Sequence, residues 1–78
     1  MKPITTEKAV MKIESDNVIT FITDLKDDKK TIKKEVEEIF EVKIEDVRTS
    51  IKNNTKYAYV KLSKETLALD LATKLGLI

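Results

Sequence analysis

The hydrophobic positions along the chain follow two periods, and each period predicts one kind of element. Residues 18–23, with the sequence VITFIT, are β-branched or aromatic and predict a strand that is at least partly covered on both faces. Residues 47–52 and 56–62 carry an apolar or β-branched residue at every second position, which predicts two further strands. Asn53-Asn54 between them tolerates a left-handed backbone, so we expect these two strands to form a hairpin.

Three other segments have apolar residues at helical spacing and predict helices. Residues 7–14 follow Thr5 and Thr6, which can cap a helix, and residues 29–41 follow Asp27-Asp28. We expect Ser63 to cap the third helix, and Lys74 and Gly76 to end it. The apolar stripe of this last helix consists of Leu67, Ala68, Leu71, Ala72 and Leu75.

These elements follow one another in the order α-β-α-β-β-α, with room for a short edge strand before Thr5. The order predicts an α+β fold, in which a small antiparallel sheet of three to four strands has helices packed on it. Because 78 residues suffice for only one small core, we expect residues 1–78 to form a single domain.

Composition excludes several classes of chemistry. The chain has no cysteine and no histidine, so disulfides, thiolate metal sites and histidine catalysis are all excluded. The adjacent acidic pairs Asp27-Asp28 and Glu37-Glu38 cannot converge, because neighbours on a helix point apart. We therefore expect no enzyme, no catalytic residue, no metal, no cofactor and no small-molecule substrate. No apolar run approaches the roughly 20 residues of a membrane span, so we expect a cytoplasmic protein without membrane insertion.

Charge is distributed unevenly along the chain. The stretch from Arg48 to Lys64 contains five basic residues and no acidic one, together with both tyrosines. The rest of the chain contains ten basic and fourteen acidic residues. Cations bind phosphates and aromatic rings stack on bases, so the hairpin is a candidate surface for nucleic acid, and for RNA before duplex DNA.

The two tyrosines of the hairpin allow two interpretations. Ala58, Val60 and Leu62 already form an apolar face, which leaves Tyr57, Tyr59 and Lys61 on the other. The tyrosines either pack under a helix or contact RNA. Depending on register, the partner strand places beside them either Arg48 and Lys52 or Thr49 and Ile51.

The segment TKYAYVKL resembles the third-strand motif of the RNA-recognition motif, and ITFITDL resembles its first-strand motif. The chain lacks the glycine that this motif places before its first aromatic residue, and it leaves no room for a strand after the last helix. This resemblance implies a free-standing binder of single-stranded RNA. A third interpretation is a protein-interaction domain whose surface is the acidic long helix.

A second resemblance covers about 60 residues in five ordered pieces. They are Pro3 followed by Thr6-Glu7-Lys8, Asn17 followed by VITFITD, the helix IKKEVEEIF, Val47 with Thr49, and KYAYV at residues 56–60. In this order they resemble the large-subunit ribosomal protein family numbered twenty-three, at the rim of the peptide exit tunnel. The tail LALDLATKLGLI and the very short hairpin loop are similar to the archaeal type of that family.

This second resemblance implies a structural protein that binds large-subunit ribosomal RNA beside neighbouring ribosomal proteins, in the cytoplasm on the ribosome. The implied rRNA-binding residues are Thr6, Lys8, Arg48, Thr49, Lys52, Lys56, Tyr57, Tyr59 and Lys61. The family also helps to form a docking platform for the signal recognition particle, nascent-chain chaperones and the protein-conducting channel. Glu7 is then the factor-docking residue, although a glutamate in the first turn of a helix is also favoured by the helix dipole alone.

Overall fold

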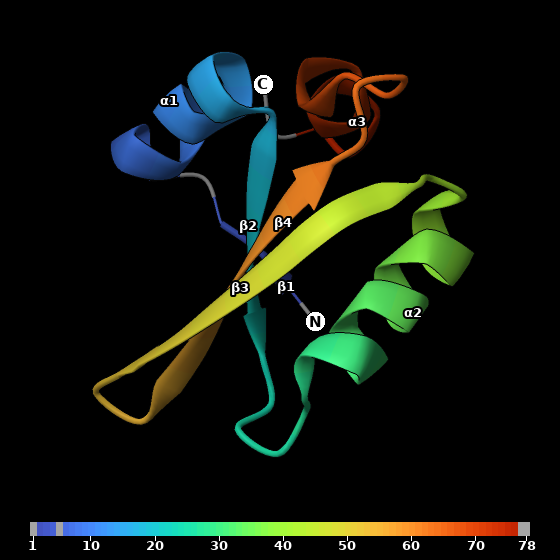
Figure 1. The fold of residues 1–78 in the computed structure, drawn as a ribbon. Coiled ribbons are helices and arrows are strands. Elements are labelled where there is room, and N and C mark those ends of the chain that lie inside the picture. Colours follow the sequence, from blue (N-terminus) through green and yellow to red (C-terminus); the bar gives the residue numbers. More distant parts are fainter. Residues whose placement is uncertain (1, 5, 77–78) are drawn as a thin grey trace.

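The computed structural model of the chain describes residues 2–4 and 6–76 and confirms the α+β fold (Figure 1). The predicted edge strand is present as β1, the strand at residues 18–23 has the predicted bounds, and the hairpin strand before Asn53 starts at Ile44 rather than at Val47. The elements are β1 (Lys2–Pro3), α1 (Glu7–Asp16), β2 (Val18–Thr23), α2 (Lys29–Phe40), β3 (Ile44–Lys52), β4 (Thr55–Leu62) and α3 (Ala68–Lys74).

The strands form one antiparallel sheet in the order β1-β2-β4-β3. The hairpin turns at Asn53 and Asn54, whose φ angles of 52° and 60° are the left-handed values that the sequence predicted. The register between β3 and β4 places Arg48 opposite Tyr59 and Ser50 opposite Tyr57. Of the two registers left open by the sequence, the basic face of β3 is therefore the one beside the tyrosines.

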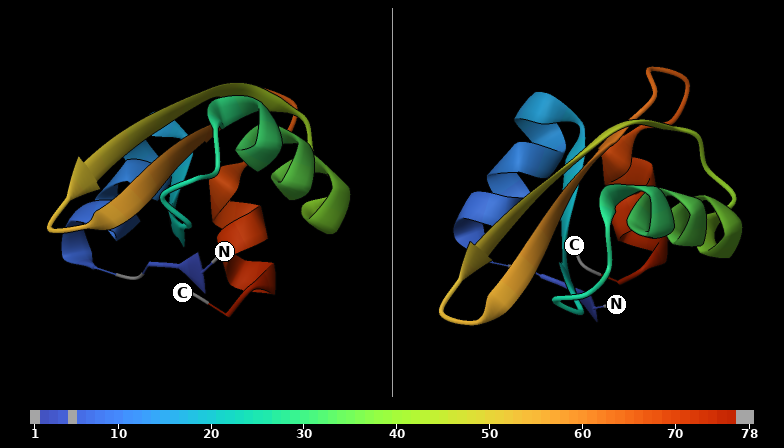
Figure 2. Two further views of the ribbon diagram at one scale, coloured as in Figure 1. Left: turned by 90° about the horizontal axis from the view of Figure 1, so that it is seen from below. Right: turned by 60° about the horizontal axis from the view of Figure 1, so that its bottom comes forward.

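Successive residues of β2 point to opposite faces of the sheet. The ring of Phe21 stacks on Phe40 at the end of α2, with 5.8 Å between ring centroids. Its neighbour Thr20 lies opposite Tyr59 and lines a groove with residues of α1. Consequently α1 and α2 lie on opposite sides of the sheet, an arrangement that can be followed in Figure 2.

We name the two faces by their residues. The covered face is the side of the sheet that carries Ile19, Phe21, Ala58 and Val60, all of which are at most 1% exposed. Together with Ile13 of α1, Ile32 and Val36 of α2 and the buried residues of α3, they belong to the hydrophobic core. Each of the larger side chains, such as Phe21, Ile32 and Val60, contributes about 1.5–3 kcal/mol of burial free energy. The tyrosine face is the opposite side, which carries Thr20, Ile22, Tyr57 and Tyr59.

Asn17 links two segments that are far apart in the sequence, the α1–β2 turn and the β4–α3 connection. It has the left-handed φ angle of 58° at the end of α1. Its side-chain amide donates hydrogen bonds to the carbonyls of Leu62, Ser63 and Thr66, at 3.3, 3.3 and 3.0 Å. Its Oδ1 accepts a bond of 2.6 Å from the amide of Ala68, the first residue of α3. The side chain thus holds the β4–α3 connection against the turn between α1 and β2.

The start of the last helix was predicted wrongly. Ser63 does not cap α3: its carbonyl accepts from the amide of Thr66 in a turn, and the helix begins only at Ala68. The residue at the cap position, Leu67, makes no side-chain cap bond, and Asn17 supplies the acceptor instead. Thr6, by contrast, caps α1 as predicted, through a bond of 3.2 Å from the amide of Ala9. Thr5 and the last two residues of the tail, 77–78, lie outside the described residues.

Candidate nucleic-acid interface

The tyrosine face is built from two rows of paired residues. Tyr59 lies between Arg48 on β3 and Thr20 on β2, and Tyr57 lies between Ser50 and Ile22 in the same way. Both rings are half-buried, whereas the predicted contact residues Arg48, Lys52 and Lys61 are exposed. An aromatic surface bordered by exposed cations is the combination that stacks bases and holds phosphates.

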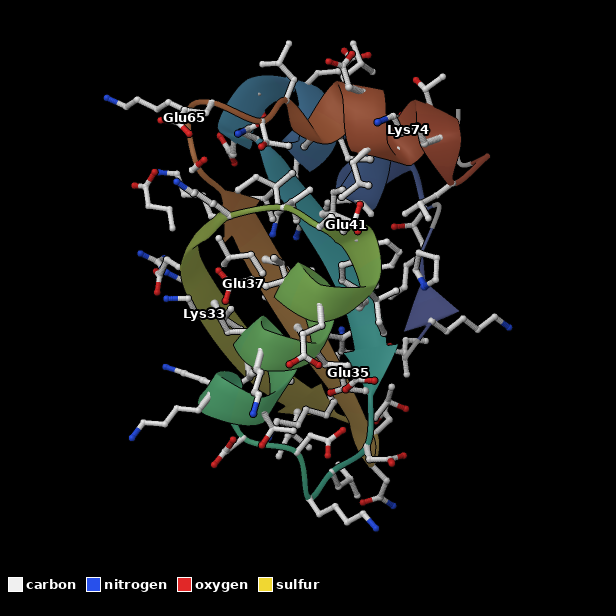
Figure 3. The ribbon with its side chains drawn as sticks, turned by 90° about the vertical axis from the view of Figure 1, so that its right-hand side faces the viewer. Lys33, Glu35, Glu37, Glu41, Glu65 and Lys74 are labelled. Carbon is white, nitrogen blue, oxygen red and sulfur yellow. The ribbon has the colours of Figure 1, made fainter. Side chains whose placement is uncertain are left out.

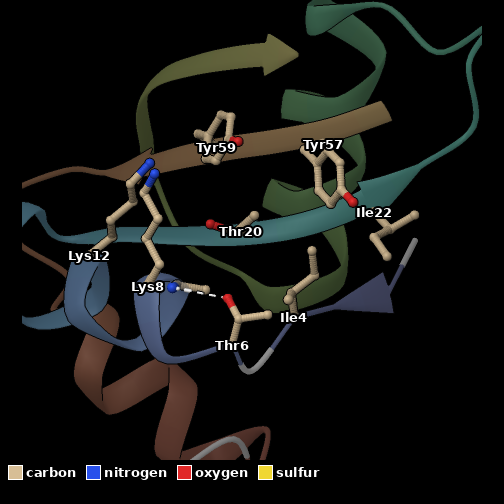
Figure 4. Close-up of a pocket in the computed structure, with 9 residues that line it drawn as sticks. Ile4, Thr6, Lys8, Lys12, Thr20, Ile22, Tyr57 and Tyr59 are labelled. Carbon is tan, nitrogen blue, oxygen red and sulfur yellow. Dashed lines mark hydrogen bonds between the residues drawn. The ribbon is translucent and has the colours of Figure 1, made fainter. Parts of the chain in front are cut away.

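Lys12 of α1 belongs to this face and was missed by the sequence analysis. Its ammonium lies 4.3 Å from the centroid of the Tyr59 ring, within the range of a cation–π contact. Lys8 is one helical turn before Lys12, and Figure 4 shows both side chains directed from α1 toward Tyr59. The i, i+4 spacing of the two lysines was visible in the sequence, but only the fold brings them to the hairpin.

A groove separates α1 from β2 and β4 (Figure 4). It is open to solvent, has a volume of about 340 Å³, and has a mainly apolar floor. Its walls bring together the start of the chain, α1 and the two tyrosines. The lining residues are Ile4, Thr6, Lys8, Ala9, Lys12, Thr20, Ile22, Tyr57 and Tyr59.

Two cations of the hairpin are paired with acidic residues of β3. Arg48 Nε lies 3.6 Å from a carboxylate oxygen of Asp46, and Lys61 Nζ lies 3.8 Å from one of Glu45. The side chains of the first pair are 83% and 56% exposed, so the pair is in water. Exposed ion pairs contribute about 0–1 kcal/mol. Both cations can therefore exchange their carboxylates for phosphates at little cost.

Strand alternation directs the side chains of two of the predicted residues away from the others, although Thr49 also lines a hollow with Arg48 and Tyr59. Thr49 lies opposite Ala58, and Lys56 precedes Ala58 by two residues on the same strand, so both side chains belong to the covered face. The half-buried ammonium of Lys56 donates a hydrogen bond to the carbonyl of Asp27, just before α2. Lys56 therefore holds the loop between β2 and α2.

Thr6, Glu7 and Lys8 are all exposed at the start of α1. The hydroxyl oxygen of Thr6 is engaged with the amide of Ala9 as the helix cap, and Thr6 and Lys8 also line the groove. Glu7 lies in the first turn of the helix, where its charge is favourable toward the helix dipole. It does not line the groove, so it is available to a different partner.

The opposite side of the molecule, on which α2 lies, is mixed in charge. Figure 3 shows Glu35, Glu37, Glu41 and Glu65 on this side, with Lys33 and Lys74 among them. The first half of α2 also carries several lysines, and the exposed Lys33 and Lys34 are examples. Positive charge alone therefore does not distinguish the two sides. The two tyrosines do, whereas a hollow is present on both sides.

Among residues 2–4 and 6–76, no helix has the length and the apolar character that a bilayer crossing requires. Nor does this part of the chain bring three or more acidic side chains close enough to hold a metal ion. The candidate site is thus a surface of cations and aromatic rings with the groove beside it. A second hollow, which Arg48, Tyr59 and Lys61 help to line, adjoins the groove at Lys12.

Comparison with known proteins identifies a family and a named relative. The family model "Ribosomal protein L23" matches residues 1–66. The chain is also 44% identical over 77 residues to the large ribosomal subunit protein uL23 of Trypanosoma brucei brucei. That alignment covers 97% of this chain and 47% of the relative, so the chain spans about half the length of the curated relative it matches.

Proposed function

The chain belongs to the ribosomal protein L23 family, and from that premise we propose that it is a structural component of the large ribosomal subunit. In this function it binds large-subunit rRNA near the polypeptide exit tunnel and is not an enzyme. The second candidate, a free-standing binder of the RNA-recognition-motif type, is less favoured because α1 lies over part of the face that such a domain would leave open.

One observation carries the proposal: cations from α1 and the hairpin surround the two tyrosines on one face. Lys8 and Lys12 approach this face from α1, and Arg48, Lys52 and Lys61 border it on the hairpin. Folded RNA offers phosphates and unpaired bases at similar spacings, so recognition by shape and charge suits this surface. Residues 1–78 then act as one rRNA-binding domain, and binding raises the stability of its small core by mass action.

The rRNA contacts that we propose are those of the tyrosine face. They include Thr6, Lys8, Arg48, Lys52, Tyr57, Tyr59 and Lys61 from the sequence analysis, with Lys12 added. We assign Lys56 and Thr49 a supporting role, because their side chains belong to the covered face.

Sedimentation of the tagged chain with large subunits in its host tests this function. We expect the chain to migrate with the large subunit and to remain there in high salt, because many phosphate contacts act together. Migration at the top of the gradient as a free protein would contradict the proposal. It would move the free-standing RNA binder to first place.

We also propose that Glu7 takes part in factor docking at the tunnel exit, where the partners are the signal recognition particle, nascent-chain chaperones and the protein-conducting channel. The support is its exposure on α1, outside the groove. Glu7→Lys should leave rRNA binding intact and weaken recruitment of these factors to ribosomes. Glu14→Lys, on the same helix, is the matched control, and normal recruitment by the Glu7 variant would rule out the docking role.

Within the family we assign the chain to the archaeal type. The support is the tail at residues 67–78 and the two-residue hairpin loop at Asn53 and Asn54. A sequence tree of the family tests the assignment, and it fails if the chain branches within the bacterial or the eukaryotic members.

A further inference from the structure

The groove between α1 and the sheet holds a polar group that the fold leaves unused. Thr20 is 5% exposed, and its hydroxyl oxygen has no hydrogen-bond partner among the residues that the structure describes. Buried hydroxyls are usually bonded, and the hydroxyls of Thr23 and Ser63 share this lack of a partner among the described residues. Of the three residues, Thr20 is the one that lines the groove, where a ligand can come close to it. A ligand with a donor or an acceptor on its edge would supply that partner.

The walls of the groove favour a flat ligand. Tyr57 and Tyr59 are two residues apart on β4, so their rings lie on the same face. They are opposite Ile22 and Thr20 of β2. The ring of Tyr59 is in contact with the ammonium of Lys12. In the described part of the chain, no cation and no second aromatic ring is found against Tyr57. Tyr57 is therefore the ring on which a base can stack without displacing a cation. Ile4 and Ile22 add apolar surface beside it.

The entrance of the groove favours a ligand with negative charge. Lys8 and Lys12 both line it, and Figure 4 shows their ammonium groups close to each other beside Tyr59. Two like charges side by side repel each other, and an anion between them removes the repulsion.

The size of the groove limits the ligand to one small planar unit. Its volume of about 340 Å³ is at the lower end of the roughly 300–1,000 Å³ that small-ligand sites occupy. A single nucleotide is of this size, whereas a base pair within a duplex cannot leave its helix to enter. The combination of a flat apolar floor, a free hydroxyl and paired cations matches one base with its phosphate.

We propose that this groove receives one unpaired nucleobase of RNA. The base stacks on Tyr57 and hydrogen-bonds to the Thr20 hydroxyl, and Lys8 and Lys12 hold its phosphate. The inference rests on the proposed rRNA-binding function and adds a defined base pocket to it. Because every base has a π-face, stacking on Tyr57 is tolerant of sequence.

The chain contains two tyrosines and no tryptophan, so its intrinsic fluorescence reports on this face alone. The probes are a single-stranded oligouridylate and a ribose-phosphate strand of the same length without bases, titrated into the full chain at low salt. We expect the oligouridylate to bind at least about five-fold more tightly and to quench tyrosine emission, since one stacked base is worth a factor of roughly 5 to 150. Equal binding of the two strands, without quenching, would overturn the base pocket.

Two variants and one matched control variant test where the base lies on the face. Tyr57→Leu keeps an apolar side chain but removes the ring, and should lower affinity for the oligouridylate to that of the abasic strand. Tyr57→Phe, the matched control, should keep the affinity. Thr20→Val replaces the hydroxyl by a methyl group of similar size. It should lower the affinity for the oligouridylate and leave the affinity for the abasic strand unchanged. If all three variants bind both strands like the parent chain, the groove is not the base site.

The outcome also separates this inference from the function on which it rests. If both strands bind equally, and large-subunit rRNA still binds to the Tyr57→Leu variant with full affinity, the pocket is excluded and rRNA binding by phosphate contacts remains. If the parent chain binds neither the strands nor large-subunit rRNA at low salt, both proposals fall. Circular dichroism of each variant establishes that it is folded before binding is measured.

Discussion

The covered face and the tyrosine face are made by alternate residues of the same strands, yet they have opposite properties. On the covered face, Phe21 and Ala58 are at most 1% exposed and pack under α2 and α3. On the tyrosine face, Tyr57 and Tyr59 are only half-buried, and the nearest helix presents lysines to them. The covered face therefore supplies most of the apolar burial that stabilises the fold, and the tyrosine face is left available to bind RNA. Substitutions that separate stability from RNA affinity test this division.

The largest effect is expected at the centre of the covered face. Phe21→Ala removes the ring that stacks on Phe40, and should lower the free energy of unfolding by about 3–5 kcal/mol. Tyr57→Leu, on the other face, should lower it by about 1 kcal/mol or less. Urea unfolding followed by circular dichroism measures both values. Equal losses for the two variants would remove the distinction between the faces.

Asn17 supports both faces, and its loss should come next in size. Asn17→Ala removes a side chain that bonds to three carbonyls and one amide, and it also places alanine at a φ angle of 58°. We expect a loss of about 3 kcal/mol, from unpaired groups and left-handed strain together. Asn17→Gly removes the bonds without the strain and should lose about 1 kcal/mol less. If Asn17→Gly is as stable as the parent chain in urea, the bonds of Asn17 do not anchor α3.

Substitutions of Lys56 and Lys52 compare the two faces within one hairpin, because Lys56 belongs to the covered face and Lys52 to the tyrosine face. Lys56→Met removes the ammonium that bonds to the Asp27 carbonyl, and should lower stability by about 1 kcal/mol while rRNA affinity changes little. Lys52→Met should leave stability unchanged and lower the salt slope of rRNA binding by about 1, as one lost phosphate contact would. Thermal melting and filter binding give the two quantities. A reduced salt slope for Lys56→Met would show that Lys56 contacts rRNA after all.

The smallest effect is expected at the cap of α2. The amide of Thr31 donates to the Asp28 carboxylate at 2.8 Å, and this bond holds the pKa of Asp28 below its usual value. A carboxylate with a lowered pKa in the folded state stabilises the fold above its unfolded pKa, near 3.9, and loses this contribution as pH falls through the folded pKa. Asp28→Asn keeps a capping oxygen without the charge. Its melting temperature should lie below that of the parent chain at pH 7 and approach it in acid. A difference that is independent of pH would contradict this.

Sequence patterns predicted the parts of the fold that depend on neighbours in the chain. The strand from Val18 to Thr23 and the caps at Thr6 and Asp28 were correct, because alternation and capping are local properties. The start of α3 was wrong because its cap comes from Asn17, which is far away in the sequence. No local pattern could show that contact.

The candidate site was predictable to a similar extent. The register of the hairpin was open until β3 and β4 were seen paired, and Lys12 reaches Tyr59 only through the packing of α1. The position of Lys56 could have been predicted. It has the same parity as Ala58 and Val60, so the alternation of β4 already assigned it to the covered face.

The central claim is that rRNA is bound by the tyrosine face and not by positive charge in general. Two double variants with the same change in charge test it: Arg48→Glu with Lys52→Glu on the hairpin, and Lys33→Glu with Lys34→Glu on α2. Their affinity for large-subunit rRNA is measured across a salt titration. We predict that the hairpin variant binds more than about ten-fold more weakly, with a salt slope reduced by about 2, and that the α2 variant stays within about two-fold of the parent chain. Equal losses, or a larger loss for the α2 variant, would contradict the account.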